Sequence, residues 1–433
     1  MWVPPKCERR QHCGRKLVAR LDTPLVLASG QRLPNRIAKA AMEEFLAVEG
    51  QLPGPGMVEL YRRWAQGAAG LMITGHVMVD RRALADPSDV VLENGTPLKP
   101  FHEWARAAQS GDGRIWLQIN HPGRVMTSDM PGPVRSASDV AVDVGRYSRL
   151  YPRPEPMTAE QIQDTVRRFA STARMAETAG FDGVQIHAAH GYLISQFLSP
   201  LTNRRQDRWG GNLDNRARLL LDIVAAVRAE VGERFAVGVK LNTADFQRGG
   251  FGADEAARVV AMLAELPVDL VELSGGSLES LATHGYAADG STLAREAYFL
   301  DTAAAIIADS TVPIMLTGGI RRRSVAEDAL ARGTAVVGMA TALAVDPGLP
   351  RRWLHGEDAT AQVTLPRWRD KALAAAAAQA TVRCRLAGLG RRDGAGRRAH
   401  PILALIAERL HRRSALRDYR RWLSGQQPAA PTE

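Results

Sequence analysis

Three side chains that can donate protons or hydrogen bonds follow one short apolar segment. Residues 181–186 are predicted to form a buried strand, and His187, His190 and Tyr192 come after it. In a barrel of alternating strands and helices, residues at the carboxyl ends of the strands carry out the chemistry. Two imidazole N–H groups that converge on one carbonyl oxygen polarise it and stabilise the negative charge that develops there. The sequence therefore predicts that His187 and His190 bind a substrate.

The same histidines could instead bind a metal ion, because barrel hydrolases hold zinc or iron through histidines. Such a site needs a third protein ligand. The candidates at neighbouring strand ends are His76 and His121. The sequence has no His-x-His pair and no carboxylate-rich strand end, so we predict no metal site. A metal-dependent barrel hydrolase stays open as an alternative function.

Strand-like and helix-like segments alternate from residue 33 to about residue 345. This alternation predicts a parallel sheet whose strands are joined by helices. Eight strands over a stretch of this length match a (β/α)8 TIM barrel, so the predicted fold class is α/β. The expected strands are 36–40, 70–74, 115–119, 183–186, 235–241, 269–273, 313–316 and 335–337.

Local signals mark one helix and two loops between these strands. Thr158 and Gln161 form a capping-box pattern, in which both side chains satisfy free backbone N–H groups. Apolar residues follow at helical spacing, which predicts a face packed against the barrel. The stretches 51–56 and 131–156, rich in Pro and Gly, are predicted to be loops. The second is long enough to serve as a lid.

The formal net charge of +10 is concentrated at the two ends of the chain. Residues 1–20 carry +5, residues 21–350 carry −5, and residues 351–433 carry +10. We expect a basic N-terminal extension, a barrel, and a basic appendage with helices at 368–387 and 401–423. A partner- or nucleic-acid-binding function of the appendage is a second alternative. A solvated basic surface is the preferred interpretation.

Apolar runs and cysteine content argue against several other classes of protein. No apolar run approaches the ~18 residues needed to span a bilayer, and the amino terminus lacks the apolar segment of a secretory signal. Cys7, Cys13 and Cys384 are the only cysteines, which gives no disulfide framework and fits a reducing cytoplasm. Three cysteines are also too few for a 4Fe–4S cluster, which generally needs four thiolates.

A longer motif around the two histidines resembles the old yellow enzyme family of flavin-dependent oxidoreductases. It reads H-x-x-H-G-Y-L-x-x-Q-F-L-S-P from His187, followed by N-x-R-x-D-x-W-G-G and N-R-x-R. The resemblance covers roughly residues 22–350. It implies FMN bound at the carboxyl face of the barrel, with NADH or NADPH as reductant. Tyr192 then matches the family's proton donor, a general acid toward the α-carbon of the substrate.

The resemblance also implies contacts with the flavin. The backbone after the first strand, at Ala41 and Met42, would touch it. Gly75, after the second strand, would leave room for the isoalloxazine ring because glycine has no side chain. Gln118 matches a glutamine whose amide bonds the pyrimidine edge. Lys240 matches a cation beside the N1–C2 carbonyl edge, where it would stabilise the anionic reduced flavin.

The phosphate of FMN is expected after strands seven and eight, where barrels often bind phosphate. Gly318 and Gly319 follow the seventh strand, and Gly338, Met339 and Ala340 follow the eighth. Backbone N–H groups at glycine can approach an anion closely, which favours phosphate binding at these positions.

Thr341 departs from the family pattern in this region. Many relatives place an arginine after the eighth strand to pair with the phosphate, whereas Thr341 occupies that position here. We expect Arg321, Arg322 or Arg323 to substitute for it.

Glu43 is a second departure, at a position where most relatives have Thr or Cys. The hydroxyl or thiol of those relatives bonds the flavin C4 carbonyl. An ionised carboxylate would repel the reduced flavin, while a protonated one could still donate the hydrogen bond, and burial raises carboxyl pKa values. The alternative is that Glu43 turns to solvent.

Together these residues predict an FMN-dependent oxidoreductase of the ene-reductase type. Hydride would pass from NAD(P)H to flavin N5 and then to the β-carbon of an α,β-unsaturated carbonyl or similar electron-poor alkene. The expected partner is this small-molecule substrate, without a membrane or nucleic acid. We expect a cytoplasmic protein and leave homo-oligomer formation open.

Overall fold

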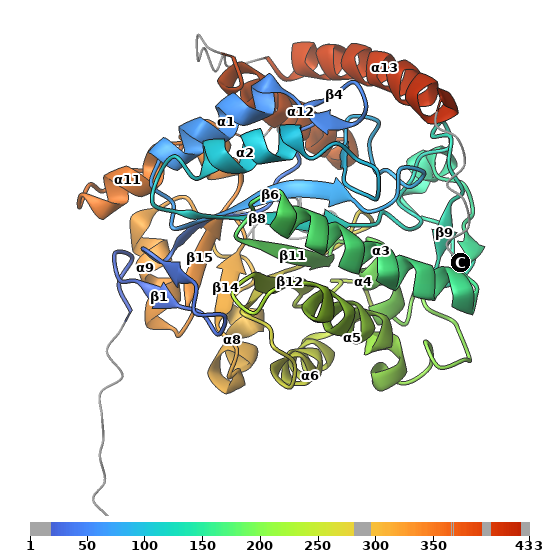
Figure 1. The fold of residues 1–433 in the computed structure, drawn as a ribbon, viewed down its shortest axis with the longest axis horizontal. Coiled ribbons are helices and arrows are strands. Elements are labelled where there is room, and N and C mark those ends of the chain that lie inside the picture. Colours follow the sequence, from blue (N-terminus) through green and yellow to red (C-terminus); the bar gives the residue numbers. More distant parts are fainter. Residues whose placement is uncertain (1–18, 281–295, 365, 367, 392–399, 426–433) are drawn as a thin grey trace, which may run out of the picture.

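Eight parallel strands close into a barrel at the centre of the molecule (Figure 1). The computed structural model describes residues 19–280, 296–364, 366, 368–391 and 400–425. Strand β3 pairs with both β15 and β6, which closes the sheet on itself. The barrel strands are β3 (Ile37–Lys39), β6 (Leu71–Met78), β8 (Arg114–Asn120), β11 (Gly183–Ala188), β12 (Ala236–Asn242), β13 (Leu270–Ser274), β14 (Ile314–Thr317) and β15 (Val336–Met339).

All eight predicted strands are confirmed, although their first and last residues differ from the predicted ones. The largest difference is in β6, which was expected to end at residue 74 and continues to Met78. Its pairing with β8 shifts between Ile73 and His76. The prediction that Gly75 follows the second strand is therefore wrong. This glycine marks an irregularity inside the strand, a common role for glycine in sheets.

Helices surround the barrel, and the amphipathic patterns of the sequence explain their packing (Figure 1). The capping box before α3 is confirmed, because Thr158 Oγ1 accepts from Gln161 N and Gln161 Oε1 accepts from Thr158 N. The helices that follow barrel strands or cover the barrel are α1 (Pro55–Gln66), α2 (Lys99–Ala108), α3 (Ala159–Thr178), α4 (Leu193–Leu198), α5 (Leu213–Glu230), α6 (Ala253–Ala264), α8 (Leu300–Asp309), α9 (Arg323–Ala331), α10 (Thr341–Val345) and α11 (Leu349–Leu354).

The two predicted loops contain some regular structure. In 51–56, β5 (Leu52–Pro53) pairs with β4 (Ala47–Val48), and α1 begins at Pro55, where proline suits the first turn of a helix. The loop prediction was therefore wrong for that helix start. The segment 131–156 is mostly irregular, with β9 (Arg135–Ser136), a 3-10 helix (Gly145–Leu150) and β10 (Glu155–Pro156). Its role as a lid stays a prediction.

The C-terminal appendage packs on the barrel domain (Figure 1). Its two predicted helices are confirmed as α12 (Lys371–Leu389) and α13 (Pro401–Gly425). Tyr419 is fully buried against barrel residues, and its hydroxyl donates to Arg81 O at 2.7 Å. Among the described residues, no helix combines the length and apolar character needed to cross a membrane. Residues 1–18, with Cys7 and Cys13, lie outside the described ranges.

Candidate active site

A cavity of about 600 Å³ lies at the carboxyl ends of the barrel strands. It brings together residues that are far apart in the sequence but follow neighbouring strands. The predicted site residues that line it are Ala41, Met42, Glu43, Gln118, His187, His190, Tyr192, Lys240, Gly318, Gly319 and Ala340. This convergence is what a parallel barrel provides, because all of its strands end on the same face.

Three predicted flavin-contacting residues do not line this cavity. A Cβ at Gly75 would lie 2.0 Å from Glu44 Oε2, so the space beside this glycine is filled by a carboxylate of the chain itself. Gly338 is similarly close to Thr317, whose Oγ1 would lie 2.3 Å from an added Cβ. Met339 is a core residue that is 1% exposed. Their assignment to FMN stays a prediction without support from the cavity.

The floor of the cavity is a continuous network of buried polar side chains from neighbouring strands. Gln118 Nε2 donates to Gln185 Oε1, and Gln185 Nε2 donates to Glu272 Oε2, each at 2.7 Å. The other oxygen, Glu272 Oε1, is 2.8 Å from Lys240 Nζ and accepts from Thr317 Oγ1 at 2.7 Å. Every member of the network thus has a partner, which holds the Gln118 amide and the Lys240 ammonium in fixed positions.

His187 is held as a neutral imidazole at the end of β11. Its Nδ1 accepts from the Ala189 N–H at 3.2 Å, so a neutral ring carries its proton on Nε2. Burial, followed by the neighbouring His190 and Lys240, lowers the pKa of His187 well below its usual range. The ring lines the cavity and is buried. It can therefore donate a hydrogen bond without carrying a charge.

His190 adopts a backbone conformation that is uncommon for residues with a side chain. Its φ is +61°, in the left-handed region, and the next residue, Gly191, has φ of +79°. Asn242 Oδ1 accepts from the His190 N–H at 3.1 Å, and His190 Nε2 lies 2.8 Å from Ser274 Oγ. Strained backbone held by specific contacts often marks a functional position. Here it places the rings of His187 and His190 5.0 Å apart, centre to centre.

Tyr192 and Glu43 meet across the cavity wall. The Tyr192 hydroxyl donates to Glu43 Oε1 at 2.8 Å. Burial, with Glu43 as the next cause, raises the pKa of Tyr192 well above its usual value. The Glu43 side chain is 30% exposed and faces the cavity, so it is turned neither to bulk solvent nor into the core. Glu43 therefore has a defined partner in the predicted proton donor.

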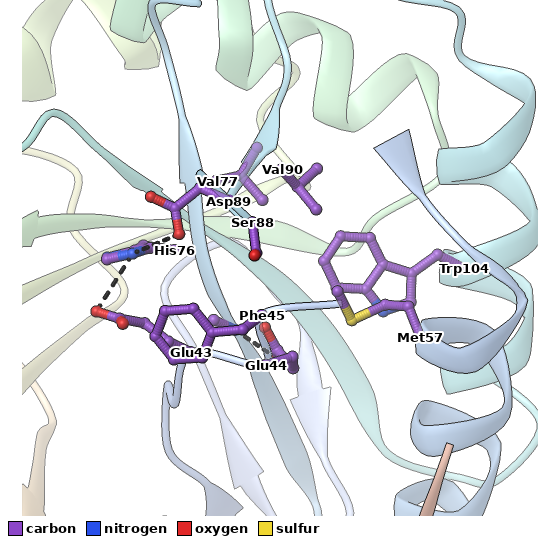
Figure 2. Close-up of a pocket in the computed structure, with 11 residues that line it drawn as sticks. Glu43, Glu44, Phe45, Met57, His76, Val77, Ser88, Asp89, Val90 and Trp104 are labelled. Atoms are coloured by element: carbon purple, nitrogen blue, oxygen red, sulfur yellow. Dashed lines mark hydrogen bonds and ion pairs between the residues drawn. The ribbon is translucent and has the colours of Figure 1, made fainter. Parts of the chain in front are cut away.

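Sequence reasoning considered His76 only as a metal ligand and did not identify Asp89. Figure 2 shows His76 between Glu43 and Asp89, with Nε2 at 3.3 Å from Glu43 Oε1 and 3.4 Å from Asp89 Oδ1. The His76 ring is also 5.3 Å from that of Tyr192, centre to centre. No sequence motif links these residues. The only available signal was the position of His76 near the end of a barrel strand.

The structure offers no ligand set for the metal-hydrolase alternative in the part of the chain that it describes. Within those residues, no group of three His, Cys, Asp or Glu side chains is arranged to hold a metal ion. His121, the other candidate, does not line the large cavity, and its Nδ1 accepts from the Gly123 N–H at 3.0 Å.

The expected phosphate region combines glycines with one arginine. Gly318 and Gly319 line the cavity with φ of +140° and +72°, conformations that favour glycine, and the rings of Phe299 and Tyr298 lie against them. Arg321 lines the cavity beside them, and its Nε donates to Glu296 Oε1 at 2.9 Å. Arg322 and Arg323 do not line it. Among the three proposed substitutes for the missing arginine, the geometry therefore favours Arg321.

The C-terminal appendage forms a wall of the same cavity, which the sequence did not predict. Its contribution consists of small or apolar side chains, most of them on one face of α12, together with three longer polar ones. These residues are Val363, Ala375, Ala378, Gln379, Val382, Arg383 and Arg412. Arg412 pairs with Asp129, and Arg383 pairs with Glu408. These two cations are therefore bound within the chain, which weakens the nucleic-acid alternative for this face.

Comparisons with known proteins place the chain in a family. Residues 20–359 match the model of the NADH:flavin oxidoreductase / NADH oxidase family. The chain belongs to this family. An NADH-dependent flavin oxidoreductase of Hypocrea jecorina is 35% identical over 350 residues, which are 76% of this chain and 87% of that protein. An NADH oxidase of Thermoanaerobacter brockii is 31% identical over 74% of this chain and 49% of that protein.

Solved structures agree with this assignment. The old yellow enzyme homologue from Zymomonas mobilis has a TM-score of 0.68 and 26% identity, covering 79% of this chain and 95% of that one. A 2-naphthoyl-CoA reductase has a TM-score of 0.72 and 25% identity, covering 79% of this chain and 53% of that one. The predicted TIM barrel and membership of the old yellow enzyme family are confirmed. The protein is an NAD(P)H-dependent flavin oxidoreductase with FMN as its cofactor.

The described residues fit FMN in charge and shape. Lys240 supplies a buried cation on the cavity floor, and Gln118 lies on the adjacent part of that floor. Gly318, Gly319 and Arg321 line the same cavity. A cavity of about 600 Å³ is within the usual range of ~300–1,000 Å³ for sites of cofactors and small ligands.

Proposed function

We propose that this flavin oxidoreductase reduces an α,β-unsaturated carbonyl or a similar electron-poor alkene. The observation that supports this most directly is the convergence of His187, His190 and Tyr192 on one cavity. The rings of His187 and Tyr192 are 4.9 Å apart, centre to centre, and those of the two histidines 5.0 Å. A pair of N–H donors next to a phenol suits a substrate that gains negative charge on oxygen and a proton on carbon.

Each of these residues has a distinct task in the proposal. The Nε2–H of neutral His187 and a ring N–H of His190 bind the substrate carbonyl oxygen and stabilise negative charge on it. Tyr192 donates its hydroxyl proton to the substrate α-carbon as a general acid. Bound FMN supplies the hydride chemistry, while the protein supplies orientation and electrostatics. Lys240 and Gln118 hold the flavin edge through the buried floor network.

The substrate test uses the purified holoprotein under anaerobic conditions. The protein is expected to be yellow, to release FMN on denaturation, and to oxidise NADH or NADPH when 2-cyclohexenone is added. The amount of cyclohexanone formed, measured by gas chromatography, should equal the amount of NADH or NADPH oxidised. Nicotinamide oxidation that requires oxygen and leaves the alkene unchanged would contradict the proposed substrate class.

A further inference from the structure

The Tyr192 hydroxyl is the first member of a chain of contacts that runs through Glu43 and His76, which also line the large cavity, to Asp89, which does not line it. It donates to Glu43 Oε1 at 2.8 Å, and this same oxygen is 3.3 Å from His76 Nε2. His76 Nε2 is in turn 3.4 Å from Asp89 Oδ1 (Figure 2). Three ionisable groups thus stand behind the proposed proton donor.

His76 is built to carry a positive charge. Its side chain is 2% exposed, so burial by itself disfavours the charged ring, but it lies between the carboxylates of Glu43 and Asp89. These two carboxylates outweigh the burial and raise the pKa of His76 to about 9. Burial raises the pKa of Asp89 to about 6, against the influence of His76. At neutral pH, these two pKa values leave His76 as an imidazolium beside an ionised Asp89.

Asn120 is consistent with a doubly protonated ring. Its side-chain amide lies 3.0 Å from His76 Nδ1, on the side of the ring away from Glu43. As placed, Asn120 Nδ2 faces the ring, and Asn120 Oδ1 is buried without a partner among the described residues. Amide oxygen and nitrogen are assigned from their surroundings. Rotating the amide by half a turn lets Oδ1 accept from the Nδ1–H of the imidazolium, which satisfies both groups.

The other charged and titratable groups near His76 do not cancel its charge. Glu44 adds a third, more distant negative influence, and it is engaged with Lys39 at 3.5 Å. The ring of His187 is 6.5 Å away, centre to centre, and stays neutral. Asp86 adds to the negative potential at Asp89, while Arg383 and Arg412 lie 3.8 Å from Asp86.

Tyr192 has a physical need for such a partner. Its raised pKa means that a phenolate is costly at this position, because burial and the Glu43 carboxylate both oppose a negative charge on the oxygen. Once the hydroxyl proton has gone to the substrate, that proton must be replaced. Glu43 Oε1 accepts from the phenol and lies 3.3 Å from His76 Nε2, which forms no hydrogen bond among the described residues. A small rotation of the imidazole toward Oε1 would complete the hydrogen bond, so that one atom can receive a proton from His76 and release it to Tyr192.

We propose that His76 is the proton reservoir for Tyr192, that Glu43 passes the proton between them, and that Asp89 is a positioning residue for His76. This proposal rests on the proposed function. Tyr192 O–H breaks as its proton goes to the substrate α-carbon. As this proton leaves, His76 Nε2–H gives its proton to Glu43 Oε1, which gives it to the Tyr192 oxygen in the same step. His76 ends as a neutral imidazole, Glu43 is again a carboxylate, and a solvent proton restores the imidazolium.

Space for a water molecule that could carry that last proton is present beside the imidazole. A small pocket of about 10 Å³ is lined by Glu43, His76, Ser88 and Asp89, among other residues. A pocket of this volume is about the smallest that can hold one water molecule.

The test is the pH dependence of the rate at which NADH-reduced enzyme reduces 2-cyclohexenone. Stopped-flow absorbance measures this rate. In the wild type, the acid form of His76 is required, so the rate should be high at low pH and fall as pH rises through about 9. Asp89→Asn removes one carboxylate, which lowers the pKa of His76 and should move this fall to lower pH. His76→Asn should remove it and slow the reaction at pH 7 by about 10-fold, less than the loss of a general acid.

His121→Asn is the matched control. His121 is a buried histidine directly after β8, as His76 is a buried histidine near the end of β6, but burial lowers the pKa of His121 to about 4 and it does not line the large cavity. Its variant should keep the fall near pH 9. A fall that is unchanged in both Asp89→Asn and His76→Asn would overturn the relay. A wild type that reduces no alkene at any pH would instead overturn the proposed function.

A second readout is independent of turnover and of the flavin. In apoprotein labelled with ¹⁵N-histidine, His76 should titrate near pH 9, and Glu43→Gln should lower that value because it removes one of the carboxylates that raise it. A wild-type His76 that titrates at an ordinary value of about 6.5 would overturn the relay, whatever the substrate proves to be.

Discussion

Two walls of the same cavity are built on different principles. The barrel wall includes the network of polar side chains described above as the floor of the cavity. Its members, at the strand ends, are Gln118, Gln185, Glu272, Lys240 and Thr317. The helical wall, contributed mainly by α12, is lined by small or apolar residues, by Gln379, and by two arginines that are paired within the chain. The first wall has the groups for chemistry and cofactor binding. The second offers mainly shape.

The two walls also differ in their relation to the family. The barrel wall lies within residues 20–359, which match the family model, whereas α12 and α13 lie beyond them. A cofactor demands the same donors whatever the substrate, so a shared barrel is expected to carry them. The shape of the alkene differs between enzymes. We therefore expect the barrel wall to control rate and cofactor, and α12 to control which substrates enter.

The largest expected effect belongs to the barrel wall. Tyr192→Phe removes the proposed acid but keeps the ring, so alkene reduction should slow by about 10²–10⁴-fold while flavin reduction by NADH stays nearly unchanged. Stopped-flow measurements of the two half-reactions check this separately. Equal slowing of both would make Tyr192 a packing residue.

Lys240 should matter for stability as well as for the flavin. The Lys240–Glu272 pair is 3% and 0% exposed, so Lys240→Met leaves a buried carboxylate without its cation. Removing one partner of a buried pair typically costs about 3–5 kcal/mol. Urea unfolding of the apoprotein should show this loss, and the double variant Lys240→Met/Glu272→Gln should recover much of it. If Lys240→Met is as stable as the wild type, the pairing of Lys240 with Glu272 does not stabilise the folded protein.

His190→Ala should weaken binding of a phenolate such as 4-nitrophenolate, because one donor to a charged oxygen is lost. The expected cost is about 1.5–3 kcal/mol, measured by titrating the absorbance of the bound ligand. Ser274→Ala is the control, since it removes the contact of His190 Nε2 with Ser274 without removing the imidazole. Unchanged affinity in His190→Ala would mean that the histidine pair does not bind the oxygen.

The smallest expected effect tests the helical wall. Ala378 lines the cavity, so Ala378→Phe should narrow it and weaken binding of a bulky ligand by about 1–3 kcal/mol. Ala376 is exposed on the same helix and does not line the cavity, so Ala376→Phe is the matched control. If both variants bind bulky and small ligands as the wild type does, α12 does not select substrates.

Much of the barrel could be predicted from local patterns in the sequence. Each barrel strand is a short apolar run, and His187, His190 and Tyr192 follow one of them directly. Once parallel strands are recognised, their carboxyl ends must share a face, which is enough to gather Gln118 and Lys240 with the histidines. The residues of the family motif lie near one another in the sequence, so the motif could be recognised without the structure. The resemblance that it carries implied FMN as the cofactor.

The tertiary structure alone decided how separate segments meet. His76 faces the cavity because β6 continues through an irregularity at Gly75. It meets Glu43 because β3 and β6 pair when the barrel closes, and it meets Asp89 because β7 (Val90–Val91), which directly follows Asp89, pairs with the end of β6. The wall formed by α12 was equally invisible in the sequence. Helical periodicity indicates that one face is buried but not against what, since that depends on packing between segments hundreds of residues apart.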